Sequence, residues 1–221
     1  MRILAVIPAR AGSKRLPGKN LLSLADKPLI AHTIERAKAC GNLTRVIVST
    51  DSNEIAQASR IFGAEVPWVR PAELATDEAA SFDVIKHALD ECEKEDGKDY
   101  DALVLLQPTS PLRSVEDIDG AIDLFKTSKA SMVVSVCEVD HPVEWTVNVD
   151  PKDFSLKQVS LTSETGQKEL RYNGAVYVYS RDFLMQGKPG IPDDAKAYIM
   201  PRARSVDIDD ELDFKLAEAL L

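Results

Sequence analysis

Short apolar runs alternate with amphipathic stretches through the first two thirds of the chain. Continuous or β-branched apolar runs are typical of buried strands, and such runs occupy residues 3–7, 46–48, 65–69, 102–106 and 132–136. Between these runs, apolar residues recur at helical intervals around residues 29–37, 55–62, 82–92 and 118–125. The alternation predicts an α/β fold in three layers, with helices on both faces of a mostly parallel sheet.

Short polar residues mark where several of these helices should begin. Asp51 with Glu54 resembles a capping box, and so does Ser114 with Asp117. Asp210 is expected to cap the last amphipathic helix, because a carboxylate is favoured at the positive end of the helix dipole.

The alternating pattern stops after Glu138 and resumes at residues 174–179 and 198–200. The intervening segment is polar and rich in loop-forming residues, with only weak strand signals. We expect one domain over residues 1–221, in which residues 139–170 form an extension of the kind that often mediates dimerisation.

Ligands of a parallel α/β sheet bind in the loops that follow the carboxyl ends of the strands. Here those loops begin at Pro8, Thr50, Arg70, Gln107 and Asp209. The first loop is unusual in charge, since residues 8–25 contain basic residues and no acidic one. The basic residues are Arg10, Lys14, Arg15 and Lys19. Such a loop directly after the first strand predicts the binding of a small, specific anion.

The charge of the whole chain argues against a long anionic partner. The formal net charge is −9 at pH 7, which disfavours nucleic acid, and no basic face with interleaved aromatic side chains suggests an RNA-binding module. No apolar run approaches the length of a membrane span, and the N-terminal run ends at Pro8, unlike a secretory signal. Three dispersed cysteines suit a reducing compartment. We therefore expect a cytoplasmic protein without nucleic-acid or membrane partners.

The basic loop matches neither of two common phosphate-binding motifs. A P-loop has four residues between its glycines, followed by Lys and then Ser or Thr. Here residues 13–17 separate Gly12 from Gly18, and Asn20 follows Lys19. The dinucleotide-binding pattern G-x-G-x-x-G does not occur in the loop either. What remains is a longer phosphate loop, in which glycines admit backbone N–H groups and cations neutralise charge.

Residues 8–20 closely resemble the N-terminal signature of the acylneuraminate cytidylyltransferases (CMP-sialic acid synthetases), which belong to the CMP-nonulosonate synthetases. Further blocks resemble the same family in the same order. They read VSTD at 48–51, RPAELATD at 70–77, LQPTSPLR at 106–113, NGAVY at 173–177 and SVDID at 205–209. The resemblance covers essentially the whole chain.

This resemblance implies a Rossmann-like fold of the nucleotidyltransferase type, a homodimer, and Mg²⁺ or Mn²⁺ as cofactor. It implies that the anomeric hydroxyl of a nine-carbon acidic keto sugar attacks the α-phosphorus of CTP, giving a CMP-sugar and pyrophosphate. The expected partners are therefore CTP and a small acidic sugar.

The resemblance assigns the nucleotide to the basic loop and to nearby positions. The residues that it implies for nucleotide binding are Arg10, Ser13, Lys14, Lys19, Asn20, Arg70 and Ser81. Arg10 and Lys19 are expected to be catalytic, stabilising the charge that develops on the phosphate oxygens. Asp77 also matches a nucleotide-side position. Plain alternatives exist, since Ser81 could cap the following helix and Lys14 could be a solvated surface cation.

Asp207 and Asp209 are the metal ligands that the resemblance implies, and Asp209 is also expected to be catalytic. They flank Ile208, so an extended backbone would place both carboxylates on one face. Hard oxygen ligands suit Mg²⁺, which keeps waters and takes substrate phosphates as further ligands. Without the resemblance, an Asp-Ile-Asp sequence ahead of a helix is more often a cap than a metal site.

The sugar side is where the resemblance weakens. The residues that it implies for sugar binding are Gln107, Arg171, Asn173 and Tyr177. Sialic-acid-specific members often carry a basic residue where this chain has Glu144, and an arginine where residues 162–169 have none. The acceptor is therefore left open among N-acetylneuraminate, legionaminate, pseudaminate and their relatives, with Kdo less favoured.

Two other functions are compatible with such a fold. Nucleotidyltransferases of this architecture that use UTP or GTP usually open with a G-x-G-T-R loop, which this chain lacks. A non-catalytic nucleotide-sugar sensor would be expected to have lost a carboxylate or the basic loop, and both are retained here.

Overall fold

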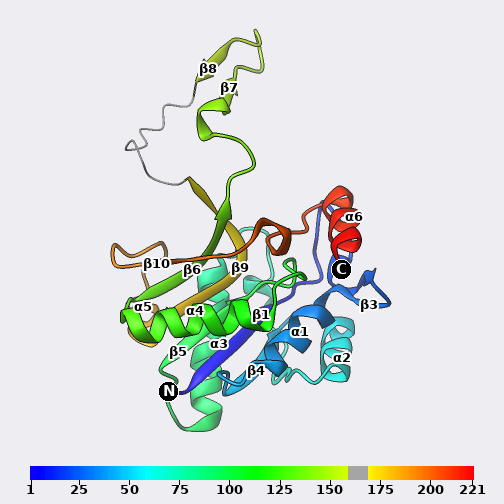
Figure 1. Cartoon of the computed structure of the whole chain (residues 1–221). Coiled ribbons are helices and arrows are strands. Elements are labelled where there is room, and N and C mark those ends of the chain that lie inside the picture. Colours follow the sequence, from blue (N-terminus) through cyan, green and yellow to red (C-terminus); the bar gives the residue numbers. More distant parts are fainter. Residues whose placement is uncertain (159–168) are drawn as a thin grey trace.

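The computed structural model describes residues 1–158 and 169–221, and its centre is a six-stranded sheet (Figure 1). The strands lie in the order β10-β6-β9-β5-β1-β4. In chain order they are β1 (Ile3–Pro8), β4 (Arg45–Ser49), β5 (Ala102–Leu106), β6 (Met132–Glu138), β9 (Leu170–Ser180) and β10 (Lys196–Ile199). Strand β1 is parallel to β4 and β5, and β10 is parallel to β6, whereas β9 is antiparallel to both of its neighbours. The expected mostly parallel sheet is thus confirmed.

Helices cover both faces of the sheet and complete the expected three layers (Figure 1). They are α1 (Leu29–Ala39), α2 (Asn53–Ile61), α3 (Ser81–Asp96), α4 (Val115–Ser128), α5 (Arg181–Met185) and α6 (Glu211–Leu220). Helices α1, α2 and α4 pack on one face, and α3 and α5 on the other. The short elements are η1 (Lys19–Leu21), β2 (Ser23–Leu24), β3 (Lys27–Pro28), η2 (Ala72–Leu74), η3 (Val143–Trp145), β7 (Val147–Val149), β8 (Leu156–Gln158) and η4 (Arg202–Arg204). Within the described ranges, no helix has both the length and the apolar character that crossing a bilayer requires.

Strand β1 is buried on both faces, as its continuous apolar run predicts. Ile3, Ala5 and Ile7 pack into the cluster beneath α1 and α4, whereas Leu4 and Val6 pack into the opposite cluster beneath α3. Each of these side chains is 0% exposed. Because β1 lies between β4 and β5, the basic loop that follows it is flanked by the ends of two other strands.

The strand expected at residues 65–69 does not form, and that prediction was wrong. Its pairing with the edge strand β4 is reduced to a single parallel bridge between Ile47 and Glu65. Pro67 has no N–H to donate to a ladder, and the side chain of Val69 is 61% exposed. The apolar residues of this segment therefore do not reflect a buried strand.

The cap of α2 lies one residue later than expected. Ser52 is the N-cap, and its side chain accepts a hydrogen bond from Ile55 N. Asp51 instead accepts a hydrogen bond from Ala11 N at 2.8 Å. The carboxylate after β4 thus holds the basic loop in place rather than starting a helix.

Strand β9 carries a bulge against β6, where the register shifts between Val134 and Val136. Gly174 lies in this stretch of β9 with φ +74°, a left-handed conformation that costs glycine little because it has no Cβ. A Cβ here would lie 3.2 Å from Asp207 Oδ2 and 3.2 Å from Gln107 Oε1. The bulge therefore brings the backbone of β9 against two polar side chains from other parts of the chain.

The extension expected at residues 139–170 leaves the sheet as the projecting hairpin β7–β8 (Figure 1). Large apolar side chains of this hairpin and of η3 before it face solvent in the single chain. Trp145 is 70%, Phe154 is 76% and Leu156 is 69% exposed. Residues 159–168 lie outside the described part. Such a concentration of exposed apolar side chains is typical of a contact surface.

Residues from the two ends of the chain meet in a small apolar cluster. Its buried members are Leu24, Leu29, Val206, Ile208 and Ala217. Ile208 is 0% exposed, and its N–H donates to Thr109 O at 2.8 Å. The cluster therefore fixes the backbone around Ile208 relative to the loops that follow β1 and β5.

A buried carboxylate at the start of α4 holds the segment that leads to this cluster. The capping box expected from Ser114 and Asp117 is confirmed, and so is the cap that Asp210 provides for α6. Asp117 is 0% exposed and also accepts two hydrogen bonds from Arg204, both at 2.8 Å. Burial alone would raise the pKa of Asp117, but the bonds from Arg204 and Ser114 outweigh it and lower the pKa.

Replacing Asp117 by Asn should destabilise the protein, because Arg204 loses its anionic partner. We expect the free energy of unfolding to fall by about 2–3 kcal/mol at pH 7. The pKa of Asp117 is lower in the folded protein than its ordinary value of about 4 in the unfolded chain. The contribution of Asp117 to stability is therefore fully present at pH values above that ordinary pKa, and it is lost as the pH falls through the pKa of the folded state. Urea denaturation at pH 7, 5 and 3 measures the difference.

The exposed neighbour Glu116, replaced by Gln, is the matched control and should change stability less. A difference between wild type and Asp117→Asn that stays constant down to pH 3 would contradict the ion-pair explanation.

Candidate functional site

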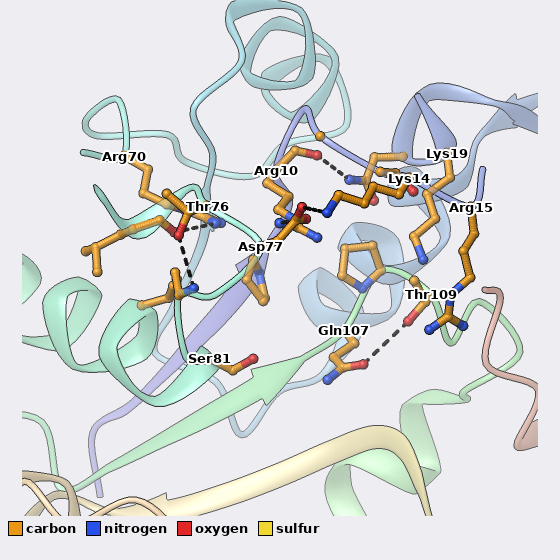
Figure 2. A pocket seen from close by; sticks show the side chains of 18 of the residues that line it. Arg10, Lys14, Arg15, Lys19, Arg70, Thr76, Asp77, Ser81, Gln107 and Thr109 are labelled. Atoms are coloured by element: carbon orange, nitrogen blue, oxygen red, sulfur yellow. Dashed lines mark hydrogen bonds and ion pairs between the residues drawn. The ribbon is translucent and has the colours of Figure 1, made fainter. Parts of the chain in front are cut away.

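A cavity of about 530 Å³ lies at the carboxyl edge of the sheet (Figure 2). Its walls come from the loop after β1, from residues 70–84, from the end of β5 and from Asp209. Every position expected on the nucleotide side lines it, namely Arg10, Ser13, Lys14, Lys19, Asn20, Arg70 and Ser81. A cavity of this volume suits a small-molecule ligand.

Positive charge dominates this cavity. Its cationic lining residues are Arg10, Lys14, Arg15, Lys19 and Arg70, and its acidic ones are Asp77 and Asp209. The excess of cations is local, because the protein as a whole carries a net charge of −9. The arrangement attracts an anion small enough to enter the cavity.

Asp77 pairs with two cations of the basic loop (Figure 2). Arg10 Nη1 lies 2.6 Å from Asp77 Oδ1, and Lys14 Nζ lies 2.5 Å from Asp77 Oδ2. Hydrogen bonds from Lys14 and then from Arg10 lower the pKa of Asp77. An anion that enters the cavity must compete with this carboxylate for both cations.

The other end of the basic loop faces Asp209, almost at the end of the chain. Lys19 Nζ donates to Ile208 O at 2.8 Å and lies 3.5 Å from Asp209 Oδ1. Arg15 Nη1 lies 2.6 Å from Asp209 Oδ2. The Lys19 side chain is only 16% exposed, so water screens its charge less. The structure thus brings together two of the residues expected to be catalytic.

Gly18 and Asn20 shape the loop around these cations. Gly18 has φ 67° and directly precedes η1, a left-handed position that favours glycine. Asn20 is 7% exposed, and its Nδ2 donates to Arg10 O at 3.1 Å. Asn20 therefore anchors the backbone from which the Arg10 guanidinium extends.

Arg70 braces the end of β4 where it borders the cavity. It is 5% exposed, its Nε donates to Ser49 Oγ at 3.0 Å, and its Nη2 donates to Ser49 O. Burial, with a smaller contribution from the charge of Arg10, lowers the pKa of Arg70 to about 10 against the opposing effect of Asp51. The side chain remains cationic at neutral pH, but several of its donors bind the protein itself.

Ser81 and Gln107 face the cavity from α3 and from the end of β5 (Figure 2). The alternative role of Ser81 as a helix cap does not hold, because Ala80 occupies the N-cap position and makes no side-chain cap bond. Gln107 Oε1 accepts a hydrogen bond from Thr109 Oγ1 at 3.5 Å. Both side chains therefore present polar groups next to the cationic loop.

A second cavity, of about 420 Å³, opens beside Asp207. Its charged lining residues are Asp140, Arg171, Arg202, Asp207 and Asp213, and α6 contributes Leu216 and Leu220. Arg202 pairs with Asp140, and Arg171 Nε lies 3.6 Å from Asp140 Oδ2. Arg171, expected on the sugar side, is thus in a different cavity from Gln107. Arg202 was not among the positions expected from the sequence, where its only signal is that it precedes the SVDID block by three residues.

The two expected metal ligands open onto different cavities. Asp209 lines the first and Asp207 the second, while Ile208 between them packs into the apolar cluster. Burial raises the pKa of Asp207; a hydrogen bond from Thr109 opposes the rise and the charge of Asp209 adds to it. Asp207 Oδ1 is buried and has no hydrogen-bond partner in the described structure.

These carboxylates fit a hard divalent cation. A buried carboxylate oxygen needs a partner, and a cation at Asp207 Oδ1 would supply one. Mg²⁺ is usually bound by one or two carboxylates, with waters and phosphate oxygens completing its shell. No group of three or more His, Cys, Asp or Glu side chains is arranged for a metal within the described residues. The chain therefore offers Asp207, through its unpartnered buried oxygen, and Asp209, in the cationic cavity, as carboxylates for such an ion, with waters and phosphate oxygens as the remaining ligands.

Two residues expected on the sugar side line neither of these two cavities. Asn173 is 1% exposed, and its side chain bonds to Ser135 Oγ at 2.6 Å and to Ser205 Oγ at 2.9 Å. A direct sugar contact by Asn173 is therefore not supported, because its amide is used inside the protein. Tyr177 is half-buried and stacks on Tyr179, with ring centroids 6.4 Å apart.

Comparison with known proteins points to cytidylyltransferases. A family model described as cytidylyltransferase matches residues 4–213. A CMP-N,N'-diacetyllegionaminic acid synthase of Legionella pneumophila is 39% identical over 100% of this chain and 97% of its own length. An N-acylneuraminate cytidylyltransferase of Escherichia coli is 40% identical over 98% of this chain, which spans 51% of that longer protein. A pseudaminic acid cytidylyltransferase of Campylobacter jejuni is 28% identical over 100% of this chain and 96% of its own length.

Solved structures agree on the fold. CMP:2-keto-3-deoxy-manno-octonic acid synthetase complexed with CTP superposes with a TM-score of 0.75 at 21% identity, covering 100% of this chain and 98% of that one. The 4-diphosphocytidyl-2C-methyl-D-erythritol synthase of Anaerococcus prevotii gives a TM-score of 0.69 at 14% identity, covering 99% of this chain and 97% of that one. These likenesses confirm the Rossmann-like architecture expected from the sequence.

Replacing Asp77 by Asn should strengthen the binding of an anion in the cavity. The change removes the carboxylate that competes for Arg10 and Lys14. We expect the affinity for inorganic triphosphate to rise about fivefold, the scale of exposed ion pairs. Isothermal titration calorimetry at low salt measures it.

Asp83→Asn is the matched control, because it makes the same charge change on the exposed surface of nearby α3. Weaker binding by Asp77→Asn than by this control would show that Asp77 orders the two cations for the ligand instead of competing with it.

Proposed function

This chain belongs to the cytidylyltransferase family, and we propose that it couples CTP to a nine-carbon acidic keto sugar, releasing pyrophosphate. The observation that carries this proposal is the meeting of the basic loop with Asp209 in one cavity. The sugars named in the activities of its relatives, legionaminic, N-acylneuraminic and pseudaminic acids, support the acceptor class.

The basic loop is suited to the triphosphate of CTP. Attack at the α-phosphorus builds negative charge on the equatorial phosphate oxygens and on the departing pyrophosphate. Arg10, Lys14 and Lys19 lie on the wall of one cavity, already close to carboxylates that hold their charged groups in place. Cations fixed before the reaction stabilise developing charge without a further cost of reorganisation. We assign Arg70 and Ser81 to the nucleoside end of CTP.

Asp207 and Asp209 would hold Mg²⁺ or Mn²⁺. When bound, the ion neutralises phosphate charge and acts as a Lewis acid toward the reacting oxygens. The chain's own contribution is to anchor the backbone between them through the buried Ile208 and to leave one buried oxygen of Asp207 without a hydrogen bond from the described residues. Arg15 and Lys19 neutralise Asp209 until a ligand enters.

The acceptor sugar is proposed to bind between Gln107 and Arg171. Gln107 faces the first cavity and Arg171 the second, and Asp207, which also lines the second, lies with Gln107 close to Gly174 in the bulge of β9. An arginine suits the carboxylate of a keto-acid sugar. Glu144, where sialic-acid-specific members often have a basic residue, lies in η3 at the base of the hairpin. The second departure, at residues 162–169, falls mostly outside the described residues.

Pyrophosphate release tests this function directly. We expect release only when CTP, Mg²⁺ and one of a panel of acidic sugars are present, the panel holding N-acetylneuraminate, legionaminate, pseudaminate and Kdo. Reactions with ATP, GTP and UTP are the controls. Tight CTP binding without release for any sugar would favour the sensor alternative, and equal release with UTP would contradict the proposed preference for CTP.

Asp209→Ala should lower kcat at least a hundredfold, because it removes a carboxylate proposed to hold the ion that neutralises the reacting phosphate. The melting temperature should stay within a few degrees of wild type, since the Asp209 side chain is 49% exposed. The matched control is Glu211→Ala, a nearby exposed acid paired with Lys215, which should keep full turnover. Full turnover by Asp209→Ala would overturn the assignment.

We also propose that the protein is a homodimer through the hairpin β7–β8. The support is the exposure of Trp145, Phe154 and Leu156, which a second copy could cover. Light scattering after size exclusion should give the mass of two chains for wild type and of one chain for Phe154→Ser/Leu156→Ser. Ile61→Ser, at an apolar residue of α2 that is 74% exposed, is the control and should stay dimeric. A monomeric wild type at micromolar concentration would refute the proposal.

The cytoplasm is the proposed location. The free thiols of Cys40, Cys92 and Cys137 are all buried, and burial raises the pKa of Cys40 and Cys92 to about 12. Thiols kept neutral and enclosed behave as small core residues, which suits a reducing compartment.

A further inference from the structure

The side chain of Asn173 has no hydrogen-bonding capacity left for a ligand. Its Oδ1 accepts from Ser135 Oγ at 2.6 Å and from Ala175 N at 3.2 Å. Its Nδ2 donates to Ser205 Oγ at 2.9 Å and to Met200 Sδ at 3.2 Å. An amide offers two acceptor lone pairs and two N–H groups, so these contacts use all of them. The residue is 1% exposed.

The contacts of Asn173 lead to Asp207 by two routes. Ser205, which accepts the amide N–H, is 1% exposed and donates to Pro201 O at 2.8 Å. Ser205 stands two residues before Asp207, so its anchored side chain fixes the backbone that leads to Asp207. Gly174 follows Asn173, and a Cβ there would lie 3.2 Å from Asp207 Oδ2. The same short stretch of β9 thus fixes the backbone before Asp207 through Asn173 and, at Gly174, leaves out the side chain that would crowd its carboxylate.

Asp207 needs such support. Its Oδ1 is buried without a hydrogen-bond partner in the part of the chain that the structure describes, and a buried charged oxygen without a partner is unfavourable. A side chain in that position would turn toward another donor unless the surrounding structure prevented it. The anchored Ser205 restricts that movement through the backbone, because its buried hydroxyl is bonded to both Asn173 and Pro201.

We propose that Asn173 is a positioning residue for the metal-binding carboxylate Asp207, and not a ligand of the sugar. This inference rests on the metal role given to Asp207 in the proposed function. Asn173 spans β6, β9 and the segment after β10 through Ser135 and Ser205, and so couples the bulge of β9 to the site. Residues that orient metal ligands in this way typically change metal affinity 10- to 100-fold when they are replaced.

Titration with Mn²⁺ in the presence of saturating CTP, without any sugar, tests this inference independently of turnover. The readout is the Mn²⁺ concentration that gives half of the maximal rise in melting temperature, and Asp207→Ala supplies the baseline. We expect Asn173→Ala and Ser205→Ala each to need about tenfold more Mn²⁺ than wild type. CTP binding measured in EDTA should not change.

Ser59→Ala is the matched control. Ser59 is also 0% exposed, and its hydroxyl donates to Ile55 O at 2.7 Å within α2, so this variant loses a buried hydrogen bond away from the site. It should show the Mn²⁺ dependence of wild type. Should Asn173→Ala fail to fold, Ser205→Ala decides the question alone, because it removes the same link from its other end.

Two results would overturn the inference. One is an unchanged Mn²⁺ dependence in the folded variants, above all with a raised KM for the sugar, which is the behaviour of a sugar ligand. The other is a wild type whose stability with CTP does not respond to Mn²⁺. A wild type that responds to Mn²⁺ but turns over no sugar would refute the proposed function while the variants still test the role of Asn173.

Discussion

Burial of Ile208 is the contact on which the functional cavity depends. This residue stands between two acidic ones, is 0% exposed, and binds Thr109 and Lys19 through its backbone. Burying an isoleucine side chain contributes about 1.5–3 kcal/mol, which helps to offset the cost of holding Asp207 partly out of water. Without this apolar anchor, the carboxylates would have no fixed relation to the loops that follow β1 and β5.

The cavity is organised around two carboxylates, each of which pairs with two cations. Asp77 forms ion pairs with Arg10 and Lys14, and Asp209 forms ion pairs with Arg15 and Lys19. The cations are thereby held near where phosphate oxygens would lie, so a ligand exchanges one set of anions for another. Such an arrangement favours a ligand with several negative charges over one with a single charge, because only the former replaces both carboxylates.

Local sequence signals predicted much of this structure, and failures arose where distant segments decide. The buried strand β1 and the Ser114 cap follow from neighbouring residues alone. The lining of the first cavity followed from motif resemblance. Residues 65–69 do not form the expected strand because they contain Pro67 and lie at the edge of the sheet. The enclosure of Asn173 depended on a register shift between β6 and β9, which no periodicity in one segment reveals.

The place of β9 in the sheet has a consequence for synthesis on the ribosome. This strand is inserted between β5 and β6, both of which precede it in the chain. Until residue 180 has emerged, each of the earlier strands has an unpaired apolar edge, the kind of edge that promotes aggregation. The two parts of the sheet therefore cannot join until β9, which pairs with both, has been synthesised up to Ser180, at about four fifths of the chain.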